Sequence, residues 1–168
     1  MQISIKQIIY ISITTGIISL LSFSCQKKEV YPLTPIIEFK DYSIIRRNGI
    51  DSNIVISFSF KDGDGDIGYS DDDKNMSVFV YYYKKKGGVF NLTVNPDSSN
   101  NFNVKLPMIL PDGVKRPIKG DIDYLINIYY DLSLSKNDTV YVEFYLQDRA
   151  LNKSNLIASP EIVLKKRL

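Results

Sequence analysis

The sequence predicts an all-β fold, and three observations lead to this prediction. From Ile36 onward, no long segment places apolar residues at a period near 3.6, the spacing of an amphipathic helix. Instead, apolar and polar residues alternate in several short segments, which is typical of strands with one buried face. Clusters of Gly, Pro, Asn and Asp separate these segments, as tight turns require. We therefore expect residues 36–168 to form one folded domain.

The alternation is clearest in residues 53–60. Ile54, Ile56, Phe58 and Phe60 share one face there, whereas the other face is mostly polar. Further strands are expected at residues 36–46, 76–83, 89–94, 102–106, 121–130, 139–147 and 156–164, with turns at 86–88, 95–97, 111–113 and 135–138. Seven to eight short strands at this spacing favour an antiparallel β-sandwich of the immunoglobulin-like type, as in fibronectin and cadherin domains.

The first 24 residues have a different composition from the rest of the chain. Lys6 supplies a positive start, and an apolar run follows from Ile8 to Leu21. At about fourteen residues this run is shorter than the roughly twenty that span a bilayer, but it suits the core of a signal peptide. The run ends in a small residue directly before Cys25, which is the pattern that signal peptidases cleave. Residues 1–24 are therefore predicted to be a signal peptide, and an uncleaved anchor helix is the alternative.

Cys25 is the only cysteine, so it cannot form an internal disulfide. Its position next to the expected cleavage site indicates that a lipid is attached covalently to the thiol. Acyl chains contribute about 0.8 kcal/mol per buried methylene, so together they would anchor the protein to a membrane. The segment from Leu20 to Cys25 resembles a bacterial lipobox. Residues 25–35 then form a tether that Pro32 and Pro35 keep extended.

An acidic loop follows the clearest strand. Asp62, Asp64 and Asp66 alternate with glycines, which permit the tight turning that brings three carboxylates together. Oxygen ligands in a flexible loop suit calcium, and the absence of histidine makes softer metals poor candidates. The spacing partly matches an EF-hand loop, with Gly68 at the backbone-carbonyl position and Asp73 at the last. The alternative is a solvated acidic turn in which the glycines only reverse the chain.

A second loop is expected to contribute to the same site. Asp148 and Asn152 lie between the last two predicted strands. In a sandwich, that loop and the acidic loop lie at the same end of the domain. Asp148 and Asn152 are therefore candidate metal ligands. The alternative is that their side chains only make turn hydrogen bonds to the backbone.

Two motifs resemble those of a family. The segments FSFKDGDGDIG (residues 58–68) and VEFYLQDRALNKSN (142–155), the latter followed by IVL (162–164), resemble small Bacteroidetes-type surface lipoproteins. The second segment is also similar to the D-x-A-G-N-x-S ending of bacterial immunoglobulin-like repeats, with Leu151 at the glycine position. Lysine and glutamate just after Cys25 resemble the export tag of the same lipoproteins. The resemblance implies a lipid-anchored sandwich on the outer membrane, facing the cell surface or the periplasm, and it implies no established activity.

The composition limits the possible functions. The chain has 21 basic and 19 acidic residues, and no stretch concentrates Lys and Arg with aromatics as a nucleic-acid groove would, so nucleic acid is not expected as a partner. With no histidine, Ser-His-Asp and Cys-His catalysis are excluded. We expect a non-catalytic binding or structural module whose protein or glycan partner is unknown. The alternatives are a carbohydrate-binding accessory protein of glycan uptake, with tyrosines of 81–83 and 129–130 as a stacking platform, and a glycosidase that uses two carboxylates between Asp62 and Asp73.

Overall fold

The computed structural model describes residues 29–99, 101–128 and 138–165, and the regular structure in these ranges consists entirely of strands. None of these residues forms a helix long and apolar enough to cross a membrane. The strands are β1 (Ile36–Arg47), β2 (Ile50–Asp62), β3 (Val78–Lys86), β4 (Val89–Val94), β5 (Ile118–Asn127), β6 (Asp138–Leu146), β7 (Ile157–Ala158) and β8 (Ile162–Leu164). This confirms the all-β prediction and the expected number of strands.

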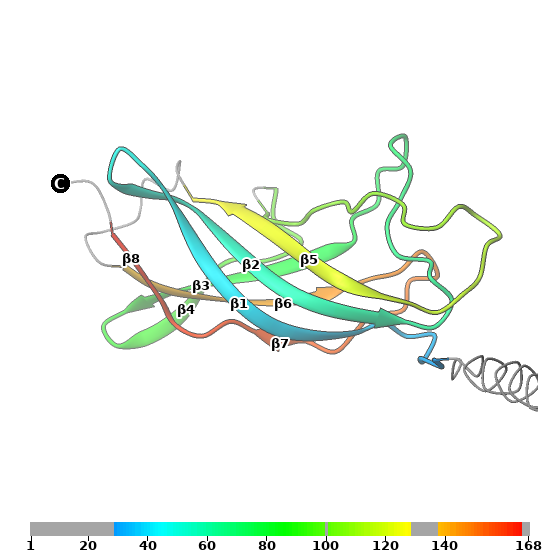
Figure 1. Ribbon diagram of the computed structural model, residues 1–168. Helices are drawn as coiled ribbons and strands as arrows, with labels where there is room; N and C mark the ends of the chain where they lie inside the picture. Colours follow the sequence, from blue (N-terminus) through cyan, green and yellow to red (C-terminus); the bar gives the residue numbers. More distant parts are fainter. Residues whose placement is uncertain (1–28, 100, 129–137, 166–168) are drawn as a thin grey trace, which may run out of the picture.

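The strands form two antiparallel sheets that pack as a β-sandwich (Figure 1). The first sheet has the order β1-β2-β5. The second has the order β4-β3-β6, with β7 and β8 both pairing along β6. The core lies between the two sheets because alternate side chains of β2, β3, β5 and β6 point inward.

The inward face of β2 is the one predicted from the alternation. Ile54, Ile56 and Phe58 are fully buried, and Phe60 is nearly so. Phe58 packs against Phe144 of β6 with the two ring centroids 5.0 Å apart, which joins the two sheets. The same alternation places the side chain of the next even-numbered residue of β2, Asp62, on the core side.

Two hairpin turns use the left-handed backbone conformation. Gly87 and Gly88 have φ of 58° and 84° and close the β3–β4 hairpin, as predicted. Asn48 and Gly49, with φ of 52° and 77°, close the β1–β2 hairpin. Asn-Gly is the strongest short-range sequence signal for such a turn. This hairpin could therefore have been predicted from the sequence.

Two strand predictions were wrong. Residues 102–106 form no strand, and Val104 makes only an isolated bridge with Val78. There, the side-chain amide oxygen of Asn103 takes the place of a backbone acceptor for the N–H of Val80. The strand predicted at 156–164 is split into β7 and β8, because Pro160 between them has no N–H to continue the ladder. Residues 129–130 and 135–137 of other predicted elements lie outside the described residues.

Candidate metal centre

Asp62 is the last residue of β2, and the alternation of this strand places its side chain on the core side. The residue has no exposed surface. Its Oδ2 accepts hydrogen bonds from the backbone N–H groups of Gly65 (2.6 Å) and Asp66 (3.2 Å), which folds the following residues into a tight turn. Gly65 has φ of 77°, a conformation that a side chain at this position would strain. One carboxylate oxygen of Asp62 therefore organises the acidic loop.

The turn brings Asp62, Asp64 and Asp66 together. One carboxylate oxygen from each residue lies within 4.8 Å of the others. In every case, Oδ2 has a protein partner. Oδ2 of Asp66 accepts from the N–H of Ala150 at 3.1 Å, and Oδ2 of Asp64 lies 3.6 Å from Nζ of Lys115. The three Oδ1 atoms are buried and accept no hydrogen bond from the protein.

The electrostatics of this cluster are unfavourable without a cation. Burial is the main cause that raises the pKa of Asp62 to about 6, and the charges of Asp66, Asp64 and Asp148 raise it further. Burial also raises the pKa of Asp66, with Asp148 and Asp64 contributing. Like charges at this separation repel by on the order of a few kcal/mol per pair at an effective dielectric constant near 20. The three aspartates can hold a metal ion, which would supply the missing partner of each Oδ1.

The second predicted loop does lie beside the acidic loop. The N–H of Arg149 donates to the carbonyl of Asp66 at 3.0 Å, next to the contact of Ala150 with the Asp66 carboxylate. Asp148 is fully buried, but its two oxygens accept from the N–H (2.8 Å) and the side-chain amide (2.9 Å) of Asn152. Asp148 and Asn152 thus make the turn hydrogen bonds of the alternative interpretation, and Asp148 contributes negative charge near the cluster.

Asp73 is not part of the cluster of three carboxylates, and the carbonyl of Gly68 already has a protein partner. The carbonyl of Gly68 accepts from the guanidinium of Arg149 at 2.9 Å. The carbonyl of Asp73, together with those of Ser70 and Asp71, accepts from Nζ of Lys105 at 2.6 to 3.1 Å. The carboxylate of Asp73 accepts a hydrogen bond from the N–H of Asn75, two residues further along the chain. This part of the loop is therefore folded around an ammonium group that the chain itself provides.

The cationic residues of this end were not predicted from the sequence. Arg149 donates to the carbonyls of Ile67, Gly68 and Leu110, and its Nε lies 3.3 Å from the carboxylate of Asp112. It therefore ties three loops together. Its position directly after Asp148 was visible in the sequence, but nothing in the local pattern indicates partners more than 35 residues away.

The tether also reaches this end of the domain. Nζ of Lys119 on β5 lies 2.6 Å from the carboxylate of Glu29. A Cβ at Gly63 would lie only 2.6 Å from the carbonyl oxygen of Pro32, so only glycine allows the tether to pack this closely against the acidic loop. Cys25 itself lies outside the described residues.

No family model matches the chain, and no curated protein or solved structure shows significant similarity to it. The side chains of this end provide three carboxylate oxygens that could bind a metal, a surrounding excess of negative charge and a backbone scaffold fixed by Arg149.

Leu151 provides a test of the loop that supports the cluster. Its φ is 67°, and its side chain is largely exposed, so the strain of the left-handed conformation is offset by little burial. We predict that Leu151→Gly raises the free energy of unfolding by about 1 kcal/mol, because glycine adopts this conformation without strain. Urea unfolding measures the effect. Leu151→Ala is the matched control, since it shortens the side chain and keeps the strain; equal stability of the two variants would contradict the prediction.

Asp62→Asn tests the electrostatic cost of the metal-free cluster. Because the pKa of Asp62 is raised to about 6 in the folded state, its stabilising contribution is complete below pH 3.8 and is lost as the pH rises through about 6. Asparagine keeps an acceptor for Gly65, and its NH₂ group can donate toward Asp64 and Asp66. In chelator, we therefore expect the variant to melt above the wild type at pH 7.5 and to lose this advantage near pH 4.5. If the difference in melting temperature between the variant and the wild type does not change with pH, the ionised carboxylate of Asp62 does not destabilise the folded state.

Proposed function

We propose that this protein is a non-catalytic, lipid-anchored surface module whose loop end is stabilised by calcium bound to Asp62, Asp64 and Asp66. The observation that carries the metal assignment is that the two oxygens of each carboxylate differ in their contacts. One oxygen of each contacts the surrounding protein, and the other is buried without a protein partner. The cluster also brings one carboxylate oxygen from each residue within 4.8 Å of the other two. Buried charged groups without a partner are costly, so this arrangement indicates a ligand that is strongly positive.

The dimensions and charge of the cluster suit calcium. Calcium binds oxygen at 2.3 to 2.6 Å, so two oxygens on opposite sides of the ion can lie up to about 5 Å apart. The three ligand oxygens lie within 4.8 Å of one another, which fits this range. Magnesium is usually held by one or two carboxylates and keeps several waters, so a cluster of three carboxylates favours calcium. Three carboxylates leave several coordination positions for backbone oxygens or water.

The neighbouring turn provides an internal comparison. There, three carbonyl oxygens surround Nζ of Lys105, so the chain supplies its own cation. Around the three aspartates, the nearest ammonium is that of Lys115, whose side chain is largely exposed and lies 3.6 Å from Asp64. Neither Asp62 nor Asp66 makes an ion pair among the described contacts. The Arg149 guanidinium partly offsets the raised pKa of Asp66, but its N–H groups are bound to three carbonyls. The first half of the loop therefore depends on a cation from solution.

The anchor is proposed from Cys25 and the position of the tether. Glu29 and Pro32 lie against the end of the domain that carries the aspartates. The four residue-to-residue steps from Cys25 to Glu29 span at most about 14 Å. A lipid on Cys25 would hold the acidic loop close to the membrane, which we propose to be the outer membrane, with the domain on the cell surface. A rigid loop end would fix the orientation of the domain relative to the lipid.

Catalysis is disfavoured by the burial of the same carboxylates. The raised pKa of Asp62 is a property that a glycosidase acid needs, but the residue has no exposed surface. A substrate could not reach its oxygens without displacing the loop that Arg149 holds in place. We therefore assign the cluster a structural rather than a catalytic role.

A glycan-binding role finds little support in the tyrosines of the second sheet. On its outer face, Tyr83 stacks on Tyr141 and Phe79 on Tyr145, with the planes within 6° of parallel. The ammonium of Lys153 lies 5.1 Å from the centre of the Tyr145 ring. These rings use their faces on one another or on lysine, whereas sugar stacking needs exposed ring faces. Tyr129 and Tyr130 lie outside the described residues.

Calcium titration of the chain from Gln26 onward tests the metal assignment. We predict micromolar to millimolar binding by calorimetry, and stabilisation of about 3 kcal/mol at 100 times the dissociation constant. Asp64→Ala and Asp66→Ala should abolish both. Asp71→Ala and Asp72→Ala are matched controls, since these aspartates are exposed in the same loop and should leave binding unchanged. Absence of heat and of any shift in melting temperature would refute the proposed site, and tighter binding of magnesium would refute the choice of metal.

Metabolic labelling with a fatty acid tests the anchor separately. We predict that the protein incorporates labelled palmitate and fractionates with membranes, and that Cys25→Ser abolishes incorporation because the thiol that carries the lipid is lost. Ser24→Ala is the control, since it leaves a small residue before the cysteine. If the wild-type protein incorporates no labelled palmitate, the proposed lipid anchor is contradicted. The proposal of a calcium site does not depend on this result.

A further inference from the structure

One edge of the sandwich is open along a whole strand. β5 pairs with β2 on one side, and no hydrogen bond from a described residue reaches the backbone on its other side between Ile118 and Ile126. Exposed edges of this length are a liability that proteins usually protect. An unprotected edge is therefore a candidate surface for pairing with another strand.

The register identifies which residues offer the free groups. The N–H of Ile128 donates to the carbonyl of Ser52 at 3.0 Å, in the same register as the β2–β5 ladder. In an antiparallel ladder, every second residue bonds to a given neighbour, so the even-numbered residues of β5 face β2. The N–H and C=O groups of Lys119, Asp121 and Asp123 consequently point to the open edge.

The other edge strands are blunted. On β1, the side-chain amide of Asn155 bonds both the N–H (2.9 Å) and the C=O (2.8 Å) of Ile37. A bulge between Phe39 and Asp41 then interrupts the same edge. β4 is shorter than β5, with six residues against ten. β7 and β8 are short and are separated by a proline. Among the described strands, only β5 combines length with an uncapped edge.

We propose that β5 pairs with β5 of a second copy of this chain, antiparallel, about a two-fold axis at Asp121. This register places Lys119 opposite Asp123 of the other copy, and the two-fold symmetry repeats the pair. Two symmetric ion pairs between Lys119 and Asp123 would then link the copies on the solvent face of the sheet. Both side chains are exposed there in the single chain. The two Asp121 residues meet at the axis, and each already carries Lys40 at 2.7 Å, which offsets their repulsion.

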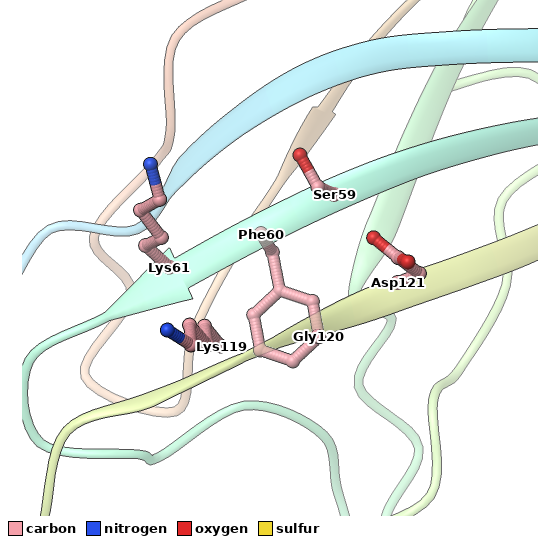
Figure 2. Close-up of a pocket in the computed structure, with 6 residues that line it drawn as sticks. All are labelled: Ser59, Phe60, Lys61, Lys119, Gly120 and Asp121. Atoms are coloured by element: carbon pink, nitrogen blue, oxygen red, sulfur yellow. The ribbon is translucent and has the colours of Figure 1, made fainter.

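The shape of the inner face favours the same register. Gly120 has no side chain, and a Cβ there would lie 3.0 Å from the ring of Phe60, which lies beside it (Figure 2). The ring thus occupies the space that a side chain at position 120 would need, and a shallow pocket nearby is lined by Ser59, Phe60, Lys61, Lys119, Gly120 and Asp121. In the proposed pairing, Ile122 of the second copy lies opposite Gly120, so its apolar side chain can approach the Phe60 ring without meeting a Cβ. Ile122 is only partly buried in the single chain, so the pairing would also remove its remaining apolar surface from water.

Cysteine cross-linking of the full chain tests this pairing. With Asp121→Cys, the two introduced thiols should meet at the axis, where opposing Cα atoms in an antiparallel ladder lie about 5.5 Å apart, within reach of a disulfide. We expect oxidation in membranes to give a reducible dimer of this chain. Ser43→Cys, exposed on β1, is the matched control, and the wild type shows what Cys25 alone contributes. Equal cross-linking of Asp121→Cys and Ser43→Cys, or cross-linking to a different protein, would overturn the proposal.

Two further variants separate edge pairing from misfolding. Asp123→Pro removes an N–H that β2 does not use, so the domain should keep its melting temperature within a few degrees while the Asp121→Cys dimer disappears. Asp123→Ala keeps the N–H and should retain the dimer. Lys119→Asp and Asp123→Lys should each weaken dimerisation by about tenfold, and the combined swap should restore it. Persistence of the dimer in folded Asp123→Pro, or no recovery in the double variant, would exclude this register.

Discussion

The burial of the Asp62 carboxylate is the constraint on which the loop end of this domain depends. The alternation that places Ile54, Ile56, Phe58 and Phe60 in the core continues for one more step and carries an acid inward. An acid at this position must be satisfied on every side. The backbone of Gly65 and Asp66 satisfies one oxygen and thereby creates the turn. The other oxygen is buried without a protein partner, so the residue that shapes the loop also belongs to a cluster of three aspartates that could hold a metal ion.

Arg149 explains how this costly arrangement is kept in place. Its guanidinium binds carbonyls from the acidic loop and from the loop before β5, while its backbone N–H binds the carbonyl of Asp66. The three loops are thereby fixed as one unit before any ion binds. Preorganisation of this kind lowers the entropic cost of binding, because few bonds remain to be ordered. The strained backbone of Leu151, which follows in the same loop, is consistent with a conformation imposed by the surroundings rather than by local preference.

The sequence revealed the parts of this structure that are encoded locally. Alternation over 53–60 identified a strand, Gly87 and Gly88 identified the β3–β4 turn, and the spacing of Asp62, Asp64 and Asp66 identified the cluster. The parts that failed depend on partners distant in sequence. Nothing near residues 102–106 indicates that the side chain of Asn103 replaces a backbone acceptor. The binding of Lys105 to the carbonyl of Asp73 is equally invisible, because it joins residues 32 positions apart.

Anchoring and edge pairing would reinforce each other. A single strand pair between exposed edges buries little surface, so in dilute solution it would be weak. Attachment to a membrane confines copies to two dimensions and raises their effective concentration, which favours a weak symmetric contact without any new interaction. The pairing residue Lys119 also holds Glu29 of the tether, so the tether and the open edge meet at the same end of β5. A cation that stiffens the adjacent loop would then restrict the angle at which two anchored copies meet, and it would do so without being part of the contact.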